Sequence, residues 1–162
     1  MNYVTSTEPG QLILRLSADD LSSSRTFGFT HYIGDKFLGR ASELNSFDKL
    51  VIRARSSDTQ SVKAKITLIN KDAFAFSAFV VLTNNFQDLT ISLDRLVPDS
   101  MLLLPRPYPE FMPIWFKAQG VSTFNLSETE KIQITISNDL NDAHLKKSYS
   151  LEVQSIWLDR KK

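Results

Sequence analysis

The chain has 162 residues, a length that suits one domain with a sizeable core. Its 19 basic and 18 acidic residues leave a net charge of +1. The chain therefore lacks the positive field that would attract nucleic acids or anionic membranes. The absence of cysteine excludes disulfides, thiolate catalysis and cysteine-ligated metals. The first residues have no basic segment followed by an apolar core, so we expect no signal peptide in this sequence, and no apolar run approaches a membrane span. We therefore expect one domain, residues 1–162, excised from a larger multidomain protein, with no nucleic-acid partner and no membrane insertion.

Alternation of apolar and polar residues with a period of two dominates the sequence, and no segment has the 3.6-residue period of a long helix. The alternating segments are 11–17, 49–55, 62–69, 88–93 and 131–137. They predict an all-β fold, a jelly-roll β-sandwich of two antiparallel sheets with seven to nine strands.

Two of these segments are joined by SSDTQS, which is typical of a hairpin loop. A hairpin would align Arg53, Arg55, Lys63 and Lys65 as one basic stripe on its outer face. Such a stripe suits an acidic glycan, or equally a solvated face whose charges discourage aggregation at the sheet edge.

The segment 74–82, FAFSAFVVL, is apolar on both faces and predicts a central strand that is covered on both sides. The last alternating segment, 149–158, changes phase near its middle, which predicts a β-bulge. Trp157 is out of phase with Ile156 and Leu158, so we expect it to cover a sheet edge or to pack on a neighbouring domain. The predicted core includes the following residues: Phe76, Phe79, Ile66, Ile134 and Leu151.

Two connections, residues 18–48 and 94–125, are too long for simple turns. The second contains LPRPYPEFMPIWFK, which holds four of the six prolines of the chain, and fixed proline φ angles make such a loop stiff. Ser127 to Glu130 fits a capping box, which predicts a single helical turn before the strand at 131.

The run from 88 to 136 carries a family resemblance. Its segments LLLPRPYPEFMPIWF and FNLSETEKIQITI, with LINKDAFAFSAFVVL upstream, resemble galactose-binding-like jelly-roll carbohydrate-binding modules appended to glycoside hydrolases of Bacteroidetes. Phe86 stands where these modules often have tryptophan, and Ala73 replaces their usual turn glycine. The resemblance implies a secreted, non-catalytic domain of a polysaccharide-degrading protein. Its partners would be a polysaccharide or oligosaccharide and a neighbouring catalytic domain, and its location would be extracytoplasmic, periplasmic or at the cell surface.

Sugar binding requires aromatic rings that stack on the C–H faces of pyranoses, with a few polar groups for the hydroxyls. The proline-rich loop supplies Tyr108, Trp115 and Phe116 as a possible platform, with Arg106 beside them. In the other long connection, His31 and Tyr32 would complete the site if the two loops meet at one edge. A structural alternative is that the same rings fold back and cap the sandwich.

Catalytic and metal-binding motifs are missing from the sequence. Neither histidine has the context of a nucleophile elbow, and no zinc, phosphate or EF-hand pattern is present. We therefore expect a domain that is not an enzyme and needs no cofactor, although a structural calcium could use Asp19, Asp20 or Asp159. Three functions remain open: a glycan-binding module, a structural module docked on a catalytic domain, and a small jelly-roll lyase or hydrolase.

Overall fold

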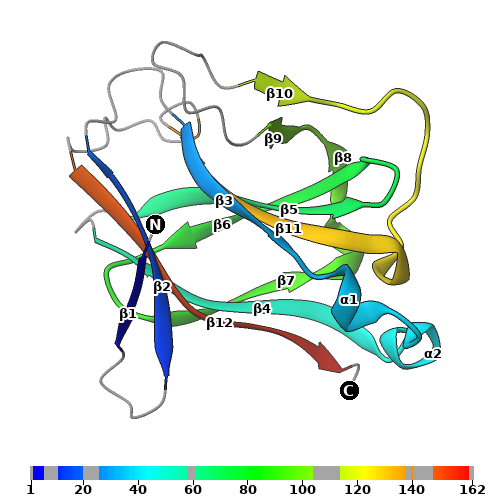
Figure 1. The fold of residues 1–162 in the computed structure, drawn as a ribbon, viewed down its shortest axis with the longest axis horizontal. Coiled ribbons are helices and arrows are strands. Elements are labelled where there is room, and N and C mark those ends of the chain that lie inside the picture. The colour runs from blue at the N-terminus through cyan, green and yellow to red at the C-terminus, as the bar shows by residue number, and fades with distance from the viewer. Residues whose placement is uncertain are drawn as a thin grey trace.

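A computed structural model of the chain describes residues 2–5, 11–19, 26–57, 61–103, 114–137, 140 and 148–160. These residues form a β-sandwich of two five-stranded antiparallel sheets packed face to face, with a separate two-stranded hairpin above one of them (Figure 1). The all-β jelly-roll prediction is confirmed. The ten strands of the two large sheets exceed the seven to nine that we expected, because residues 2–5 and both long connections also contribute strands.

The two sheets have different strand orders. Sheet A has the order β1 (Asn2–Thr5), β2 (Leu12–Asp19), β12 (Ser148–Arg160), β4 (Phe47–Ser56) and β7 (Gln87–Ser92). Sheet B has the order β3 (Thr26–Tyr32), β11 (Thr129–Ser137), β5 (Val62–Asn70), β6 (Ala75–Leu82) and β8 (Val97–Asp99). The hairpin consists of β9 (Met101–Leu103) and β10 (Ile114–Phe116).

The core lies between the sheets and follows the alternation of the sequence. Residues of β4, β5 and β11 that the pattern turns inward are nearly inaccessible to solvent, as in Ile52, Leu68 and Ile134 at 1% exposure each. Four of the five predicted core residues are buried: Phe76, Ile66, Ile134 and Leu151. Phe79 is the exception at 53% exposure, so its assignment to the core was wrong.

The exposure of Phe79 follows from strand geometry. Phe76 and Phe79 are three residues apart, so they lie on opposite faces of one strand. The prediction placed both in the core because it assumed a central strand that is covered on each side. β6 pairs with β8 only over Ala75–Ser77, so β6 has no second strand partner beside Phe79 among the described residues.

The predicted hairpin between 49–55 and 62–69 is also wrong. β4 belongs to sheet A and β5 to sheet B, so the chain crosses from one sheet to the other between them. Consequently Arg53 and Arg55 lie on the outer face of sheet A, whereas Lys63 and Lys65 lie on the outer face of sheet B. The single basic stripe therefore does not exist.

Both long connections contain regular structure. Residues 18–48 include the edge strand β3 and two short helices, α1 (Gly34–Phe37) and α2 (Ala41–Leu44). Residues 94–125 include β8, β9 and β10, and single 3-10 turns lie at η1 (Leu93–Arg95) and η2 (Leu126–Glu128).

Local details of the sequence are borne out in three places and corrected in one. The bulge in β12 is present, since its register against β4 shifts between Val153 and Ser155. Ala73 has a φ of 64°, so the turn between β5 and β6 does adopt the conformation that favours glycine. The single helical turn before β11 exists, but its cap is the Asn125 side chain, which accepts from the Ser127 amide, so the capping box at Ser127 was wrong.

Candidate functional site

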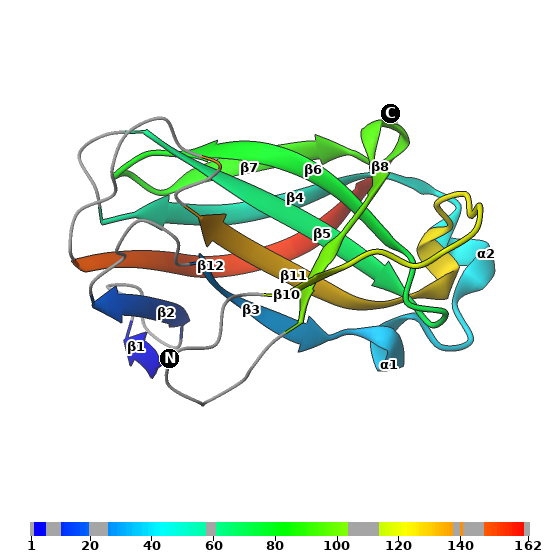
Figure 2. The same ribbon diagram turned by 90° about the horizontal axis from the view of Figure 1, so that it is seen from above.

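The hairpin β9–β10 lies over the outer face of sheet B (Figure 2) and is attached by one side chain of β11. The Leu102 amide donates to Oε1 of Gln133 at 2.8 Å, and Nε2 of Gln133 donates to the Leu102 carbonyl at 2.8 Å. The same Nε2 also donates to the Thr30 hydroxyl at 2.8 Å. Gln133 is 1% exposed, so these bonds are shielded from water. The glutamine therefore fixes the position and register of the hairpin.

Trp115 lies on the side of the hairpin that faces the sheet. It is the direct partner of Leu102, which is 2% exposed, and opposite residues in a hairpin share a face. Its ring centroid lies 4.2 Å from Nζ of Lys65, a cation–π contact. The indole is half-buried, which leaves part of the ring accessible.

Lys65 is held in place by hydrogen-bond acceptors at the end of β8. Its ammonium donates to Oδ2 of Asp99 at 2.9 Å and to the Ser100 carbonyl at 2.8 Å, and the residue is only 5% exposed. A buried ammonium with an ion pair, a carbonyl and a ring as partners is fully satisfied. We expect its position to change little when a ligand binds.

Asp99 remains ionised at neutral pH. Its partial burial alone would raise its pKa. Hydrogen bonds from Lys65 and from the Ser100 amide lower the pKa, and together with the charge of Lys65 they outweigh burial, so the pKa of Asp99 lies below its usual value. The Lys65–Asp99 pair therefore carries no net charge.

Phe79 lies beside this pair. In the β5–β6 ladder it is the direct partner of Lys65, so both side chains are on the outer face of sheet B. Phe79 and Trp115 are thus two aromatic residues adjacent to one lysine, with the Asp99 carboxylate next to it. We call Phe79, Trp115, Lys65 and Asp99 the aromatic platform.

The predicted site residues are separated by the fold. Trp115 is part of the platform, and Phe116 lies on the opposite side of the hairpin at 40% exposure. Tyr32 is on the outer face at the end of β3 and is 53% exposed. His31 lies on the other side of β3, facing the space between the sheets, and is not brought together with Trp115. Tyr108 and Arg106 lie outside the described residues.

Phe79 is the residue that the sequence interpretation missed. The signal was present in β5, where the alternation turns Lys63 and Lys65 outward. A short turn at 71–74 joins β5 to β6, so a hairpin register counted from that turn pairs Lys65 with Phe79 and places the phenylalanine outside.

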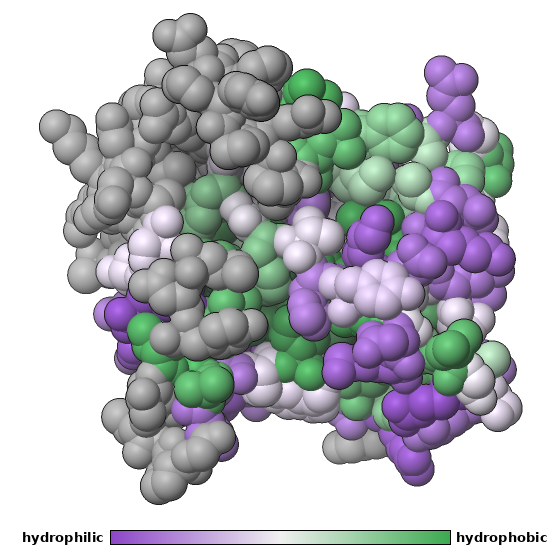
Figure 3. All heavy atoms as spheres, in the orientation of Figure 1, coloured by the Kyte–Doolittle hydropathy of each residue, from purple (hydrophilic) through white to green (hydrophobic). Residues whose placement is uncertain are grey.

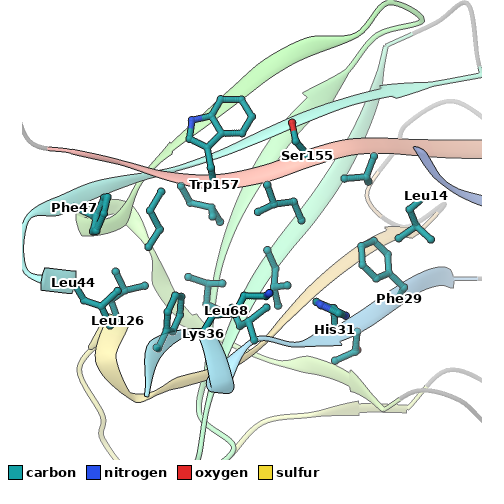
Figure 4. A pocket seen from close by; sticks show the side chains of 18 of the residues that line it. Leu14, Phe29, His31, Lys36, Leu44, Phe47, Leu68, Leu126, Ser155 and Trp157 are labelled. Atoms are coloured by element: carbon teal, nitrogen blue, oxygen red, sulfur yellow. The ribbon is translucent and has the colours of Figure 1, made fainter. Parts of the chain in front are cut away.

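A pocket of about 540 Å³ opens between the two sheets, where the edge strand β3 faces the second half of β12. Its lining is mostly aliphatic and aromatic, and Figure 4 shows Leu14, Phe29, Leu44 and Leu68 around it. Figure 3 shows apolar side chains in the middle of the corresponding face of the molecule. Trp157, which also borders the pocket, turns its ring away from the interior (Figure 4) and is 39% exposed.

Within the described part of the chain, no group of three or more histidine, aspartate or glutamate side chains could hold a metal ion. Of the aspartates considered for calcium, Asp159 accepts a hydrogen bond from the Arg160 amide, and Asp20 lies outside the described residues. No described helix is both long and apolar enough to cross a membrane.

Sequence comparison finds no matching protein-family model and no similar curated protein. The fold, in contrast, is similar to solved structures. A family 11 carbohydrate-binding module of a cellulosomal cellulase of Clostridium thermocellum matches with a TM-score of 0.58 at 10% identity, over 99% of this chain and 80% of that one. A module of the same family, in complex with a β-1,3-1,4-mixed-linked tetrasaccharide, matches with a TM-score of 0.58 at 11% identity, over 97% and 79%.

An agarase also contains this fold. It matches with a TM-score of 0.55 at 16% identity over 100% of this chain, which spans only 22% of the agarase. At these identities the likeness establishes the architecture alone. The chain has a jelly-roll β-sandwich fold like that of these carbohydrate-binding modules.

Proposed function

We propose that this chain is a non-catalytic carbohydrate-binding domain that holds a glycan chain against the aromatic platform on the outer face of sheet B. The observation that carries the proposal is the pair of rings around Lys65. Phe79 is 53% exposed, Trp115 is half-buried, and an ordered ion pair lies beside both.

The chemistry of the platform favours a neutral glycan. An exposed ring offers a stacking surface for the C–H face of a pyranose, and the Asp99 carboxylate, whose side chain is 30% exposed, offers an acceptor for hydroxyls. Because Lys65 and Asp99 neutralise each other, the platform has no excess positive charge for uronates. The acidic-glycan interpretation of a four-residue basic stripe loses its basis as well, since that stripe is split between two faces.

The similar structures support the substrate class and the setting. One similar module was solved with a mixed-linked tetrasaccharide, and an agarase contains a domain of this shape. By analogy, the ligand of this domain is a neutral polysaccharide such as a mixed-linked β-glucan or agarose. The parent protein would be an extracytoplasmic glycoside hydrolase that the domain helps to position.

Docking on a catalytic domain without sugar binding is the second candidate function. Exposed apolar side chains lie on β6 and on the side of the hairpin that faces away from Trp115: Val81 at 50%, Leu103 at 44% and Ile114 at 51%. Exposed apolar surface of this kind is common at protein interfaces. This function predicts that the isolated domain binds no glycan.

Affinity electrophoresis in gels that contain mixed-linked β-glucan or agarose tests the proposal directly. We expect retardation of the domain by at least one of the two, and a loss of affinity of about fivefold or more in Phe79→Ala. A stacking ring contributes on the order of 1–3 kcal/mol, by analogy with base–aromatic stacking. The matched control is Trp157→Ala, which removes an exposed ring from sheet A and should leave retardation unchanged.

Two outcomes would reject the proposal. If neither polysaccharide retards the unmodified domain and a wider glycan array detects no binding, the docking function is favoured. If Trp157→Ala and Phe79→Ala weaken binding equally, the platform is not the site.

A further inference from the structure

We propose that the pocket between the two sheets binds a small anionic amphiphile, a monocarboxylate with an apolar body. This site is separate from the aromatic platform, because the pocket opens on the inner side of sheet B and the platform lies on its outer side. Its volume of about 540 Å³ is within the range of pockets that enclose small molecules.

The pocket exists because two strand edges face each other without a strand between them. β12 pairs with β2 only as far as Val153, opposite Leu14, so the following residues of β12 have no partner on that side among the described strands. β11 is the one described strand with which β3 pairs. Core side chains, including Leu68 and Ile132, lie beneath these edges and are almost inaccessible to solvent. Partly buried residues such as Leu14, Ile33 and Phe37 form the accessible lining above them, so the edge of the core is open from this side.

The charge of the lining is one-sided. Among the described residues, the lining contains Lys36, Arg40 and His31 and no acidic residue. Arg40 is already compensated, because its guanidinium donates to both carboxylate oxygens of Glu43 at 2.9 Å. Lys36 has no carboxylate within ion-pair distance in the described part of the chain.

The Lys36 side chain points into the pocket. Figure 4 shows its ammonium end turned toward the middle of the lining, with His31 from β3 on one side and Leu68 below. Lys36 itself is exposed, so its ammonium lies at the mouth of the pocket and keeps its contact with water. In this position it gives an entering carboxylate an ion-pair partner, while the apolar walls accept the hydrocarbon part.

Isothermal titration of the domain tests this site with decanoate and cinnamate, which represent aliphatic and aromatic carboxylates. Decanoate is used below its micellar concentration, and 1-decanol and acetate separate the apolar and the charged contributions. We expect saturable binding of at least one carboxylate. The affinity for 1-decanol should be roughly tenfold weaker than that for decanoate, because the alcohol cannot form the charge-assisted hydrogen bond. The preferred carboxylate then identifies the source class, lipid or aromatic acid.

Two pairs of variants localise the binding. Lys36→Met should weaken carboxylate binding to the level of 1-decanol, whereas Lys131→Met, on the outer face of the same sheet, should have no effect. Ile156→Trp should fill the mouth of the pocket and abolish binding of both ligands, whereas Ile114→Trp, on the hairpin, should not. Unfolding midpoints of all four variants check that each one folds.

The proposal is overturned if neither carboxylate binds, if 1-decanol binds as tightly as decanoate, or if Lys36→Met and Ile156→Trp bind like the unmodified domain. It is also overturned if size-exclusion chromatography shows a dimer that Ile156→Trp dissociates. In that case a second copy of the chain occupies the pocket.

Discussion

The outer faces of the two sheets have the same strand geometry and opposite chemistry. On sheet A the charged residues pair across neighbouring strands: Glu152 binds Arg15 and Arg55, and Arg53 binds Asp88 at 2.9 Å. These arginines are each about 40% exposed, so their charges remain in contact with water.

Sheet B has buried polar groups and an exposed phenylalanine at the centre of its outer face, although lysines at its margins are exposed. Thr67 and Ser77 share a hydrogen bond of 2.9 Å at 0% and 1% exposure, Lys65 is buried, and Phe79 is open to solvent. The comparison indicates that sheet A is a solvated face maintained by its own ion pairs, whereas sheet B is arranged to be covered, by its hairpin and by a ligand or a partner.

The largest expected effect separates the two phenylalanines of β6. Phe76 is 2% exposed and its ring meets that of Phe124 edge to face at 5.5 Å, so Phe76→Ala should cost about 3–5 kcal/mol in the free energy of unfolding. Phe79→Ala should cost less than about 1 kcal/mol, because its ring is already half in water. Urea denaturation measures both, and equal losses would show that Phe79 is a core residue.

The attachment of the hairpin gives an intermediate effect. Gln133→Ala leaves the Leu102 amide and carbonyl without their partners, which costs roughly 1–3 kcal/mol for buried polar groups. We expect the Leu102 amide to lose its protection in NMR hydrogen exchange. The control is Gln154→Ala on sheet A, where a partly exposed amide bonds to Arg53 and Gln11, and that change should leave Leu102 protected. Unchanged protection in Gln133→Ala would show that the glutamine does not hold the hairpin.

The sequence predicted which residues face the core far better than it predicted which strands pair. The alternation of β11 correctly placed Ile132, Ile134 and Ile136 inward, because a strand has only two faces. The connection after β4 has turn-forming residues in either arrangement, so its composition does not tell a hairpin from a crossing between sheets.

The site was less predictable, because tertiary contacts determine it. The alternation of β11 places Gln133 on the outer face of the sheet, where a solvent-exposed side chain is expected. The hairpin covers this position, so Gln133 is buried and forms hydrogen bonds to Leu102. β3 was not recognised as a strand, although Phe27, Phe29 and His31 alternate inward. Gly28 interrupts the alternation of apolar and polar residues in this segment. The structure shows why a glycine occupies the position, since an added Cβ would lie 2.1 Å from the Ile134 carbonyl oxygen.

The smallest expected effect concerns the ion pairs of sheet A and their dependence on pH. The Glu152 side chain is 6% exposed, and burial alone would raise its pKa, but hydrogen bonds from Arg55 and Arg15 lower the pKa below its usual range. A pKa that is lower in the folded state contributes stability above the unfolded value of about 4.3, and this contribution is lost as the pH falls through the folded value.

We therefore expect Glu152→Gln to cost about 1 kcal/mol at pH 7, since both arginine partners are partly exposed and water screens the pair. The cost should shrink as the pH falls below about 4, where the carboxyl of the unmodified domain also becomes neutral. Asp88→Asn, which disrupts an exposed pair whose carboxylate is 49% accessible, should cost less at every pH. Urea denaturation of the three proteins at pH 7, 5 and 3 measures these differences. A cost for Glu152→Gln that grows toward pH 3 would contradict the lowered pKa, and with it the view that sheet A is stabilised by its own ion pairs.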